Sequence, residues 1–551
     1  MADTPRKIAL CSCEDTMPLD AETLRRACGG AEILSGRQLC RAELERFRAL
    51  VAGGEPVTVA CTQEAPVFAE VADEAGDEAA ALTFVNIRET AGWSRDAAAA
   101  APKMAALLAA AAEPMPQTPL ISITSEGVAL IYGRDEKAIE AADLLKDHLD
   151  ITVLVTRPGA LTPRARTDFP VVQGTIRSAK GRLGAFELTV DDYAAAAPSS
   201  RGRLQFGSPR DGAISRCDII LDLSGGAPLF PAADLRDGYL RADPGDPAAM
   251  LKAVLRARDL AGTLDKPRYI QFTEDLCAHS RSGIVGCRRC LDLCPTGAIA
   301  PAGDHVAIDP YICAGCGQCA AVCPTGAAGY ALPPADALMR KLRTLLTAYR
   351  ETGGKEPIVL IHDDTHGMPL IDALARHGDG LPANVLPLAV NEMTQVGIEA
   401  IAAAFAYGAT GMRFLLRARP RHDIAGLMRT LALAEPILAG LGYGVGRAAT
   451  IETDDPDTLD AALRAIEIGK GAERPASFQP VGGKRDVQRL ALRELQRAAP
   501  APVDVIALPA GAPFGAIDIN VEGCTLCLAC VSACPTGAML DDPERPTLRF
   551  A

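Results

Sequence analysis

The sequence predicts a multidomain protein built from α/β and α+β units. With 551 residues, the chain is long enough for about three or four domains. Short apolar runs alternate with helical patterns along most of its length, which is typical of α/β domains. The 18 cysteines are unevenly placed, mostly in an N-terminal, a central and a C-terminal group. This clustering indicates metal sites rather than disulfides, because thiols stay reduced in a chain without a secretion signal.

The first unit, residues 1–116, is expected to be a small α/β domain with cysteines at the ends of its strands. A short apolar run leads directly into Cys11, and the strand-like run 56–60 ends at Cys61. Helical patterns lie between these two runs. An alanine-rich helix over 96–112 closes the unit.

The second unit, residues 117–265, alternates between strand and helix before its pattern turns β-like. A helix is expected over 137–149 and a strand over 151–155. Two further strand-like runs, 174–180 and 185–190, are separated by a glycine-flanked turn and predict a β-hairpin.

The rest of the chain divides by composition. Residues 266–332 are rich in Cys, Gly and Pro and leave little room for helices. Residues 340–470 return to an α/β pattern, and residues 471–505 read as a polar connector with one helix. A final cysteine-rich segment covers residues 506–551.

The charge balance excludes some classes of partner. The chain has 56 Lys and Arg against 69 Asp and Glu, a net charge of −13. This argues against a nucleic-acid or anionic-membrane surface and favours a basic patch on a protein partner. No apolar run reaches the length of a membrane span, and the apolar run before Cys11 is too short for a signal peptide. We therefore expect a soluble cytoplasmic protein.

The clearest motif has the spacing C-x2-C-x2-C-x3-C-P. This spacing wraps a cubane [4Fe–4S] cluster with three thiolates and lends the fourth thiolate to a neighbouring cluster. A zinc site is the alternative, but zinc ribbons use two separated C-x2-C pairs. The four cysteines of this copy are Cys313, Cys316, Cys319 and Cys323.

A second copy lies upstream, with nine residues instead of two in its first interval. Its cysteines are Cys277, Cys287, Cys290 and Cys294. Both copies continue with Pro-Thr-Gly-Ala, and the pair resembles a bacterial two-cluster ferredoxin. That resemblance implies crossed ligation, with Cys323 completing the first cluster and Cys294 completing the second. The long interval makes Cys277 the weakest of the expected ligands.

A third copy stands alone near the end of the chain and also continues with Pro-Thr-Gly-Ala. If the same crossed ligation applies, this third copy is half of another ferredoxin fold. In the internal pair the partner motif begins 19 residues after Cys294, and the equivalent position after Cys534 would be about residue 553. We therefore expect this half-ferredoxin to be incomplete and its cluster absent or labile, unless the last ligand comes from elsewhere. Its cysteines are Cys524, Cys527, Cys530 and Cys534.

The N-terminal cysteines carry a further resemblance. Together with the run Asn86-Ile-Arg-Glu89 and Trp93, they are similar to the N-terminal domain of the A-type subunit of heterodisulfide reductase, which implies another [4Fe–4S] cluster. The sequence departs from that family at Ala91, where a further Cys is often found. Cys28 does not match the family, and unligated core thiols are the alternative. The matching cysteines are Cys11, Cys13, Cys40 and Cys61.

Residues 355–465 resemble the small delta-type subunit that joins hydrogenase or formate dehydrogenase to heterodisulfide reductase. The resemblance rests on the alanine-rich run 400–411 and the strand after it. That family holds a [2Fe–2S] cluster on cysteines, which this segment lacks, so a docking module is expected. His362 and His366 are expected to be solvated polar side chains rather than metal ligands. No flavin is expected, because the glycines near residue 443 lie after a helix instead of after a strand.

These features predict small α/β domains flanking a two-cluster ferredoxin-like domain, with a C-terminal half-ferredoxin. The expected function is transfer of single electrons through [4Fe–4S] clusters between partner oxidoreductases, in support of a formate dehydrogenase or heterodisulfide-reductase-like system. The alternatives are an assembly, maturation or redox-sensing factor for such an enzyme, and a zinc-dependent interaction protein. No catalytic residue set is found, so we expect an electron-carrier subunit rather than a self-contained enzyme. Cys217 is expected to be a buried thiol.

Overall fold

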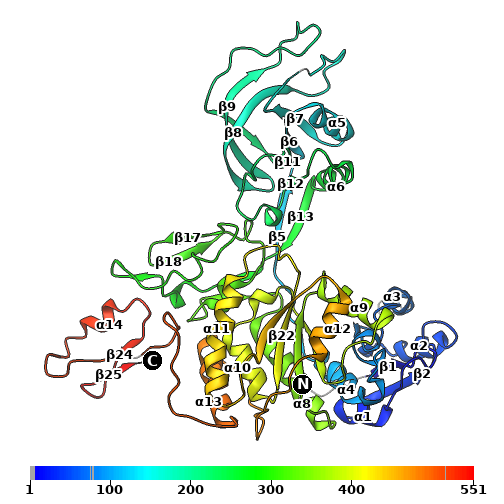
Figure 1. Ribbon diagram of the computed structural model, residues 1–551, viewed down its shortest axis with the longest axis vertical. Helices are drawn as coiled ribbons and strands as arrows, with labels where there is room; N and C mark the ends of the chain where they lie inside the picture. Colours follow the sequence, from blue (N-terminus) through cyan, green and yellow to red (C-terminus); the bar gives the residue numbers. More distant parts are fainter. Residues whose placement is uncertain (1–6, 75, 77–79, 160, 516, 551) are drawn as a thin grey trace.

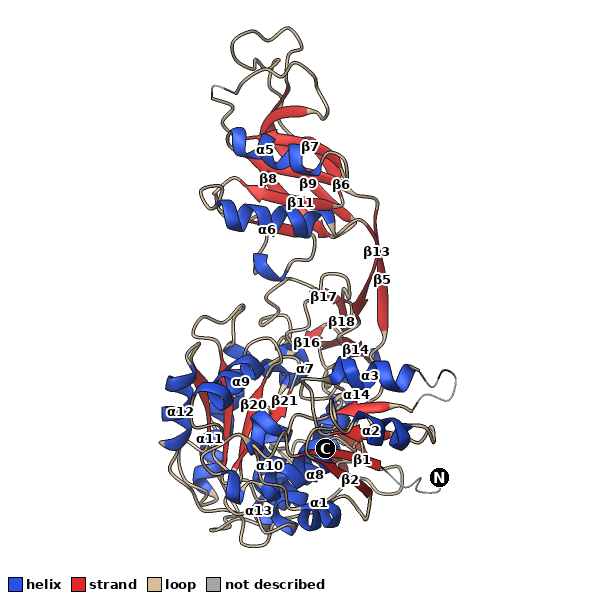
Figure 2. Cartoon of the chain, turned by 90° about the vertical axis from the view of Figure 1, so that its right-hand side faces the viewer, coloured by secondary structure: helices blue, strands red, loops and turns tan. Residues whose placement is uncertain are grey.

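The computed structural model describes residues 7–74, 76, 80–159, 161–515 and 517–550. It contains an upper and a lower body joined by a narrow two-stranded ribbon (Figures 1 and 2). The ribbon pairs β5 (Leu120–Ser125) with β13 (Gly262–Pro267) in antiparallel register. These two strands lie outside the seven-stranded sheet of the upper body.

The N-terminal unit is a four-stranded, all-parallel sheet in the order β2-β1-β3-β4. Asp20 caps the first helix by accepting a hydrogen bond from the backbone N–H of Thr23 at 3.1 Å. The parallel strands alternate with helices along the chain, which confirms the predicted α/β character of this unit. Its main elements are β1 (Lys7–Cys11), α1 (Ala21–Ala27), β2 (Glu32–Gly36), α2 (Leu44–Val51), β3 (Val57–Val59), α3 (Ala65–Asp73), β4 (Leu82–Phe84) and α4 (Ala101–Ala110).

The upper body is a mixed seven-stranded sheet in the order β10-β9-β8-β7-β6-β11-β12. One face packs against two helices, and Phe230 helps to cover the other face. The long antiparallel pair β8–β9 confirms the predicted hairpin. The elements are β6 (Val128–Gly133), α5 (Glu136–Leu145), β7 (Asp150–Val155), β8 (Val171–Arg182), β9 (Ala185–Ala195), β10 (Ala213–Cys217), β11 (Ile219–Leu223), β12 (Tyr239–Arg241) and α6 (Pro247–Arg258).

The central cysteine-rich segment has little regular structure, as its composition predicts. Three short antiparallel strand pairs and one helix of five residues are its main elements. They are β14 (Ile270–Phe272), β15 (Ser280–Arg281), β16 (Ile284–Val285), β17 (Ile299–Ala302), β18 (His305–Ile308), α7 (Gln318–Val322) and β19 (Ala328–Tyr330).

The largest unit covers residues 335–499 and has a parallel sheet in the order β21-β20-β22-β23. The stretch 471–505, expected to be a polar connector, contributes a helix whose Val487, Ala491 and Leu495 are buried in the core of this unit. The elements are α8 (Ala335–Glu351), β20 (Ile358–His362), α9 (Gly367–His377), β21 (Val385–Ala389), α10 (Ile398–Ala406), β22 (Gly411–Leu416), α11 (Ala425–Gly440), β23 (Ala448–Glu452), α12 (Pro456–Arg464) and α13 (Lys484–Arg497).

The N-terminal unit and the 335–499 unit share one apolar core. Ala106 and Ala110 of α4 lie in the same buried cluster as Leu342 and Leu346 of α8. Small side chains on α4 allow this close approach of the two helices. The two units therefore form one continuous lower body, on which the central cysteine-rich segment rests.

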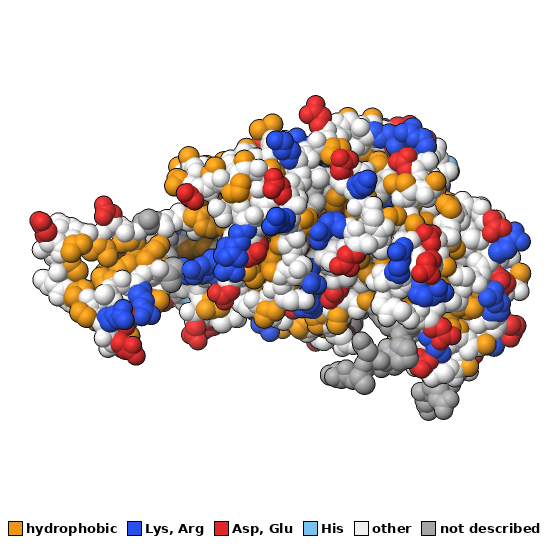
Figure 3. Space-filling model, turned by 90° about the horizontal axis from the view of Figure 1, so that it is seen from below, with side chains coloured by type: hydrophobic (Ala, Val, Ile, Leu, Met, Phe, Trp, Pro, Cys, Tyr) orange, Lys and Arg blue, Asp and Glu red, His pale blue; other side chains and the backbone are white. Residues whose placement is uncertain are grey.

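The C-terminal segment projects from the lower body as a thin extension beyond α11 and α13 (Figure 1). It contains α14 (Ala529–Ala533) and the antiparallel pair β24 (Met539–Asp541) and β25 (Leu548–Phe550). Figure 3 shows apolar side chains gathered on this extension, consistent with the exposure of Val521, Leu540 and Phe550. Among the helices in the described part of the chain, none has the apolar length needed to traverse a bilayer.

Candidate metal centres

Four cysteines from both central motifs form a first group, called here site I. Burial, and after it the neighbouring thiols of Cys287, Cys323 and Cys277, raise the pKa of Cys290 to about 12. Burial likewise raises the pKa of Cys287, with Cys323 and Cys277 contributing. The fold therefore brings Cys323 of the downstream motif near the three cysteines of the upstream motif.

The other four central cysteines form a second group, site II. Burial raises the pKa of Cys316 to about 12, and the thiols of Cys313 and Cys294 add to the shift. Burial places the pKa of Cys319 well above its usual range, with Cys313, Cys316, Cys290 and Cys294 also raising it. Cys294 thus lies with the downstream motif, and Cys290 of site I interacts with Cys319 of site II.

Backbone N–H groups are directed at several of these sulfurs. In each case the N–H belongs to the residue two positions after the cysteine, and its hydrogen bond lowers the thiol pKa. Hydrogen bonds to sulfur stabilise a thiolate and tune an iron–sulfur cluster. The backbone donors, together with the neighbouring thiols, are therefore compatible with cluster ligands. The pairs are Cys287 with Arg289, Cys313 with Gly315, and Cys316 with Gln318.

A threonine hydroxyl follows the fourth cysteine of every motif. Thr296 Oγ1 lies 3.7 Å from Cys294 Sγ, and Thr325 Oγ1 lies 3.6 Å from Cys323 Sγ. The third motif repeats the contact, with Thr536 Oγ1 at 3.2 Å from Cys534 Sγ. The recurrence of Pro-Thr-Gly-Ala in the sequence could have predicted this role for the threonine.

The loop of site II is held against the 335–499 unit. Gln318 Nε2 donates to Asp423 O at 2.6 Å, and Gln318 Oε1 accepts from Gly426 N at 2.8 Å. Gly317 has a φ of +77°, and a Cβ added there would lie 2.5 Å from Gln395 Cβ. This close approach explains the glycine, because a larger residue would push the loop away from the unit beneath it.

The N-terminal cysteines surround a cavity of about 200 Å³ that Cys11, Cys13, Cys40 and Cys61 all line. Burial raises the pKa of Cys40, with contributions from Glu64, Cys61 and Cys11. The grouping follows from the parallel sheet, because these cysteines lie at or just beyond the carboxyl ends of β1, β2 and β3. The Cys13 backbone N–H also approaches Cys11 Sγ at 3.4 Å.

Two arginines connect this cavity to the 335–499 unit. Arg88 Nη1 lies 3.2 Å from Cys13 Sγ, and Arg88 also pairs with Glu89. Arg376 of α9 forms an ion pair with the same carboxylate at 2.5 Å. Both guanidinium groups lie over the ring of Trp93, at 4.2 Å and 5.2 Å from its centroid. The run Asn86–Glu89 was visible in the sequence, whereas nothing in the sequence pointed to Arg376.

The third motif is far more open than the central pair. Cys527 and Cys530 are exposed, while Cys524 and Cys534 are partly exposed. Partial burial raises the pKa of Cys534, but hydrogen bonds from Thr536 and from the backbone at Met539 and Ala538 bring it down to about 7. Cys527 and Cys530 are therefore accessible to solvent, whereas Cys319 of site II is buried.

Other residues considered from the sequence lie outside these groups. Cys217 is buried as expected, and burial raises its pKa to about 12. Cys28 does not line the N-terminal cavity. The expectation of solvated histidines is wrong, because His362 and His366 are both buried. His366 Nε2 lies 3.0 Å from Asp454 Oδ1, so the tertiary fold supplies a partner that the sequence could not show.

A site for a single metal ion needs a different arrangement of ligands from a site for a cluster. Among the described side chains, no group of three or more His, Cys, Asp or Glu residues could hold a metal ion. In a cubane cluster each thiolate binds a different iron, so its ligands surround a volume instead of meeting at one point. The assignment of individual cysteines as ligands stays a prediction.

Comparison with known families supports the central and C-terminal motifs. A 4Fe-4S dicluster domain matches residues 284–327, and a 4Fe-4S binding domain matches residues 517–540. Cys277 lies just outside the first match. No curated protein sequence matches the chain. The two matches support a modular 4Fe-4S ferredoxin-like protein, because both are iron–sulfur, metal-binding domains associated with electron transport.

Proposed function

We propose that this protein relays single electrons between partner oxidoreductases, as an auxiliary component of a formate dehydrogenase or heterodisulfide-reductase-like system. The observation that carries the proposal is the adjacency of sites I and II. Cys290 of site I packs against the buried cluster that contains Cys319 of site II. A [4Fe–4S] cluster bound at each site would supply one-electron chemistry.

The position of the third motif supports a longer relay. A Cβ added at Gly286 would lie 2.5 Å from Pro535 Cγ, so the residue after Cys534 packs against the residue before Cys287. Arg289 Nη2 also donates to Gly511 O at 2.5 Å. Cys534 therefore lies near Cys287 of site I, and the exposure of Cys527 and Cys530 would allow a partner protein to approach the third motif.

The N-terminal cavity supports a fourth site at the other end of the lower body. Its four cysteines surround one space, and Arg88 provides a positive charge beside Cys13. Cationic groups next to thiols favour the thiolate form that metals bind. In this proposal the 335–499 unit is a rigid docking platform that carries both the N-terminal and the central sites.

The test is anaerobic purification of the full chain, followed by iron and sulfide quantitation and EPR spectroscopy. We expect brown protein, reversible one-electron reduction at low potential, and reoxidation by a partner enzyme such as formate dehydrogenase. Reducible clusters that pass no electrons to any oxidoreductase partner would favour the maturation or redox-sensing alternative. A colourless preparation containing zinc would contradict the proposal.

A further inference from the structure

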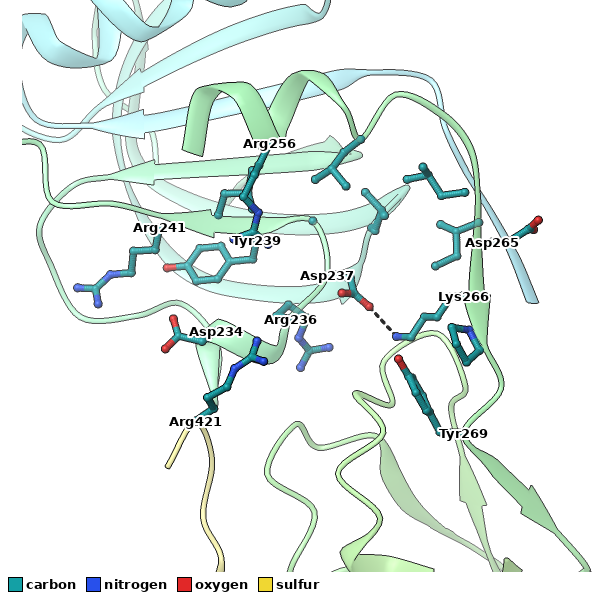
Figure 4. A pocket seen from close by; sticks show the side chains of 17 residues that line it. Asp234, Arg236, Asp237, Tyr239, Arg241, Arg256, Asp265, Lys266, Tyr269 and Arg421 are labelled. Carbon is teal, nitrogen blue, oxygen red and sulfur yellow. Dashed lines mark hydrogen bonds and ion pairs between the residues drawn. The ribbon is translucent and has the colours of Figure 1, made fainter. Parts of the chain in front are cut away.

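A large cavity lies between the upper body, the ribbon and the loop before α11 (Figure 4). Its volume is about 570 Å³, which is within the usual range of small-molecule sites and much larger than one inorganic ion needs. Leu183, Leu240 and Leu264 supply an apolar part of its wall. The cavity is separate from the N-terminal one.

The lining of this cavity is cationic in a chain whose net charge is −13. Five basic side chains face three acidic ones, and Lys266 is held by Asp237 at 2.7 Å. Within the described part of the chain, none of the four arginines forms an ion pair with a carboxylate. In Figure 4, Arg421 extends from the lower body toward Asp234 and Arg236. The arginines are Arg236, Arg241, Arg256 and Arg421.

Arg236 is the strongest sign of a missing partner. Its side chain is only 8% exposed, and its two terminal nitrogens donate to backbone carbonyls, Gly181 O at 3.1 Å and Thr296 O at 2.7 Å. The third donor, Nε, is buried and has no hydrogen-bond acceptor among the described residues. Burial keeps the pKa of Arg236 below its usual value and outweighs Asp309 and Asp237, which raise that pKa electrostatically. A buried guanidinium with an unused donor is costly, and an anion in the cavity would offset its charge.

Three side chains that line the cavity also contact the loops of site II. Arg236 donates to Thr296 O, two residues after Cys294, and Lys266 Nζ donates to Tyr311 O at 3.0 Å, two residues before Cys313. The ring of Tyr269 packs on Gly315, where a Cβ would lie 2.5 Å from Tyr269 Cδ1. A molecule bound in the cavity is therefore only one side chain away from the backbone that surrounds site II.

We propose that this cavity binds a small organic anion through a phosphate or carboxylate group held by Arg236, Arg256 and Arg421, with its carbon skeleton against the leucine wall. This site goes beyond the relay of electrons between proteins, because it gives this protein a small-molecule ligand next to one of its metal centres. A carboxylate and a phosphate share the charge and the acceptor oxygens that the arginines require.

The proposal is tested by isothermal titration calorimetry of the anaerobically purified full chain. The probes are adenosine monophosphate, succinate and inorganic phosphate. We expect saturable binding of at least one organic probe, weakened about tenfold by Arg256→Ala or Arg421→Ala, since a charged hydrogen bond contributes on that scale. Adenosine monophosphate alone would identify a phosphate ligand, and succinate alone a carboxylate ligand.

The matched control is Arg216→Ala in β10, which removes an exposed arginine of the upper body outside the cavity and should leave affinity unchanged. A second readout is the EPR spectrum of the reduced protein, which the bound organic probe should shift in the wild type and not in Arg256→Ala. Binding of no probe, binding of inorganic phosphate alone, or equal weakening by Arg216→Ala would overturn the proposal. Because binding is measured without electron transfer, it can fail while the relay function stands.

Discussion

At the scale of single residues, the environment of a cysteine separates site ligands from structural thiols. Burial raises the pKa of Cys316, and a hydrogen bond from the Gln318 N–H offsets part of that rise. Burial also raises the pKa of Cys217, and the Leu130 backbone provides a similar hydrogen bond, but no other thiol contributes to the raised pKa of Cys217. The presence of neighbouring thiols, more than burial, therefore distinguishes the two kinds of cysteine.

The first prediction concerns Cys316→Ala, which should remove the cluster of site II. The iron content should fall by about four atoms per chain, and residues 266–332 should lose stability because a segment with few large apolar residues folds around its metal. Iron analysis and visible absorbance check this result. Cys217→Ala serves as the control and should keep full iron. An unchanged absorbance in Cys316→Ala would show that the assignment is wrong.

The second prediction concerns Lys103 of α4, a fully buried amine that donates to Leu381 O at 3.3 Å and to Pro382 O at 2.8 Å. Burial lowers its pKa from 10.5 to about 7. Between these two pH values the unfolded chain binds the extra proton, so the free energy of unfolding should rise with pH. The slope from this group is at most about 1.4 kcal/mol per pH unit. Below pH 7 both states are protonated and the slope disappears.

Thermal unfolding at about pH 7.5 and about pH 9.5 measures this effect, because both values lie inside the window in which only the unfolded chain is protonated. Lys103→Met should lose the part of the pH dependence that Lys103 causes, whereas Lys137→Met, which changes an exposed lysine of α5, should behave like the wild type. Equal pH slopes in Lys103→Met and wild type would mean that Lys103 keeps its ordinary pKa in the folded protein.

At the scale of elements, α13 shows how a distant helix takes part in a metal centre. Lys484, its first residue, donates to Ala321 O at 2.6 Å and lies 3.6 Å from Glu399 Oε1. Burial raises the pKa of Cys323, but the Ala328 N–H and then Lys484 outweigh it, so the pKa is below its usual value. The helix therefore brings a positive charge to site I while its apolar face packs in the core.

The third prediction is that Lys484→Met lowers the reduction potential of the site I cluster by about 40 mV. Reduction adds negative charge, which Lys484 stabilises by on the order of 1 kcal/mol. Potentiometric titration followed by EPR measures the change. Arg493→Met, on the exposed side of the same helix, is the matched control. A potential that is the same in both variants would show that Lys484 acts only as a structural contact.

At the scale of the whole molecule, the chain folds back so that its C-terminal motif lies beside its centre. Gly286 and Pro535 are far apart in sequence but in close contact in space, and Arg289 reaches Gly511. In the described part of the chain, the upper body meets the lower body around the ribbon and the adjoining cavity (Figure 2). Removal of the C-terminal motif should therefore leave the structure of the upper body unchanged.

The fourth prediction follows from this independence. Deletion of residues 506–551 should speed hydrogen exchange at residues 284–290, because their cover is lost, and should leave exchange in residues 128–258 unchanged. The iron content should fall by about four atoms if the third motif holds a cluster. Exchange measured by mass spectrometry checks the first two results. Unchanged exchange at residues 284–290 would contradict the packing of Pro535 on Gly286.

Some features of this protein were determined by local sequence alone. The C-x2-C-x2-C-x3-C-P spacing of Cys313–Cys323 indicates its chemistry by itself, because three of the four cysteines grouped in site II lie in this one short stretch. The hairpin of β8 and β9 could also be predicted from local sequence, because its turn and the two strand-like runs follow one another directly along the chain. The α/β order of the N-terminal unit also followed from short-range patterns.

Tertiary structure alone decided which distant residues serve those sites. Arg376, Lys484 and Arg236 lie far in sequence from the cysteines beside them, and a single charged residue on a distant helix or loop has no periodicity that marks it. The helix in residues 471–505 looked like a connector because its buried stripe is narrow, and only packing against α10 made it part of a core. Spacing along the chain predicts the metal ligands, whereas the charges that surround these cysteines are set by long-range contacts that form only when the whole chain has folded.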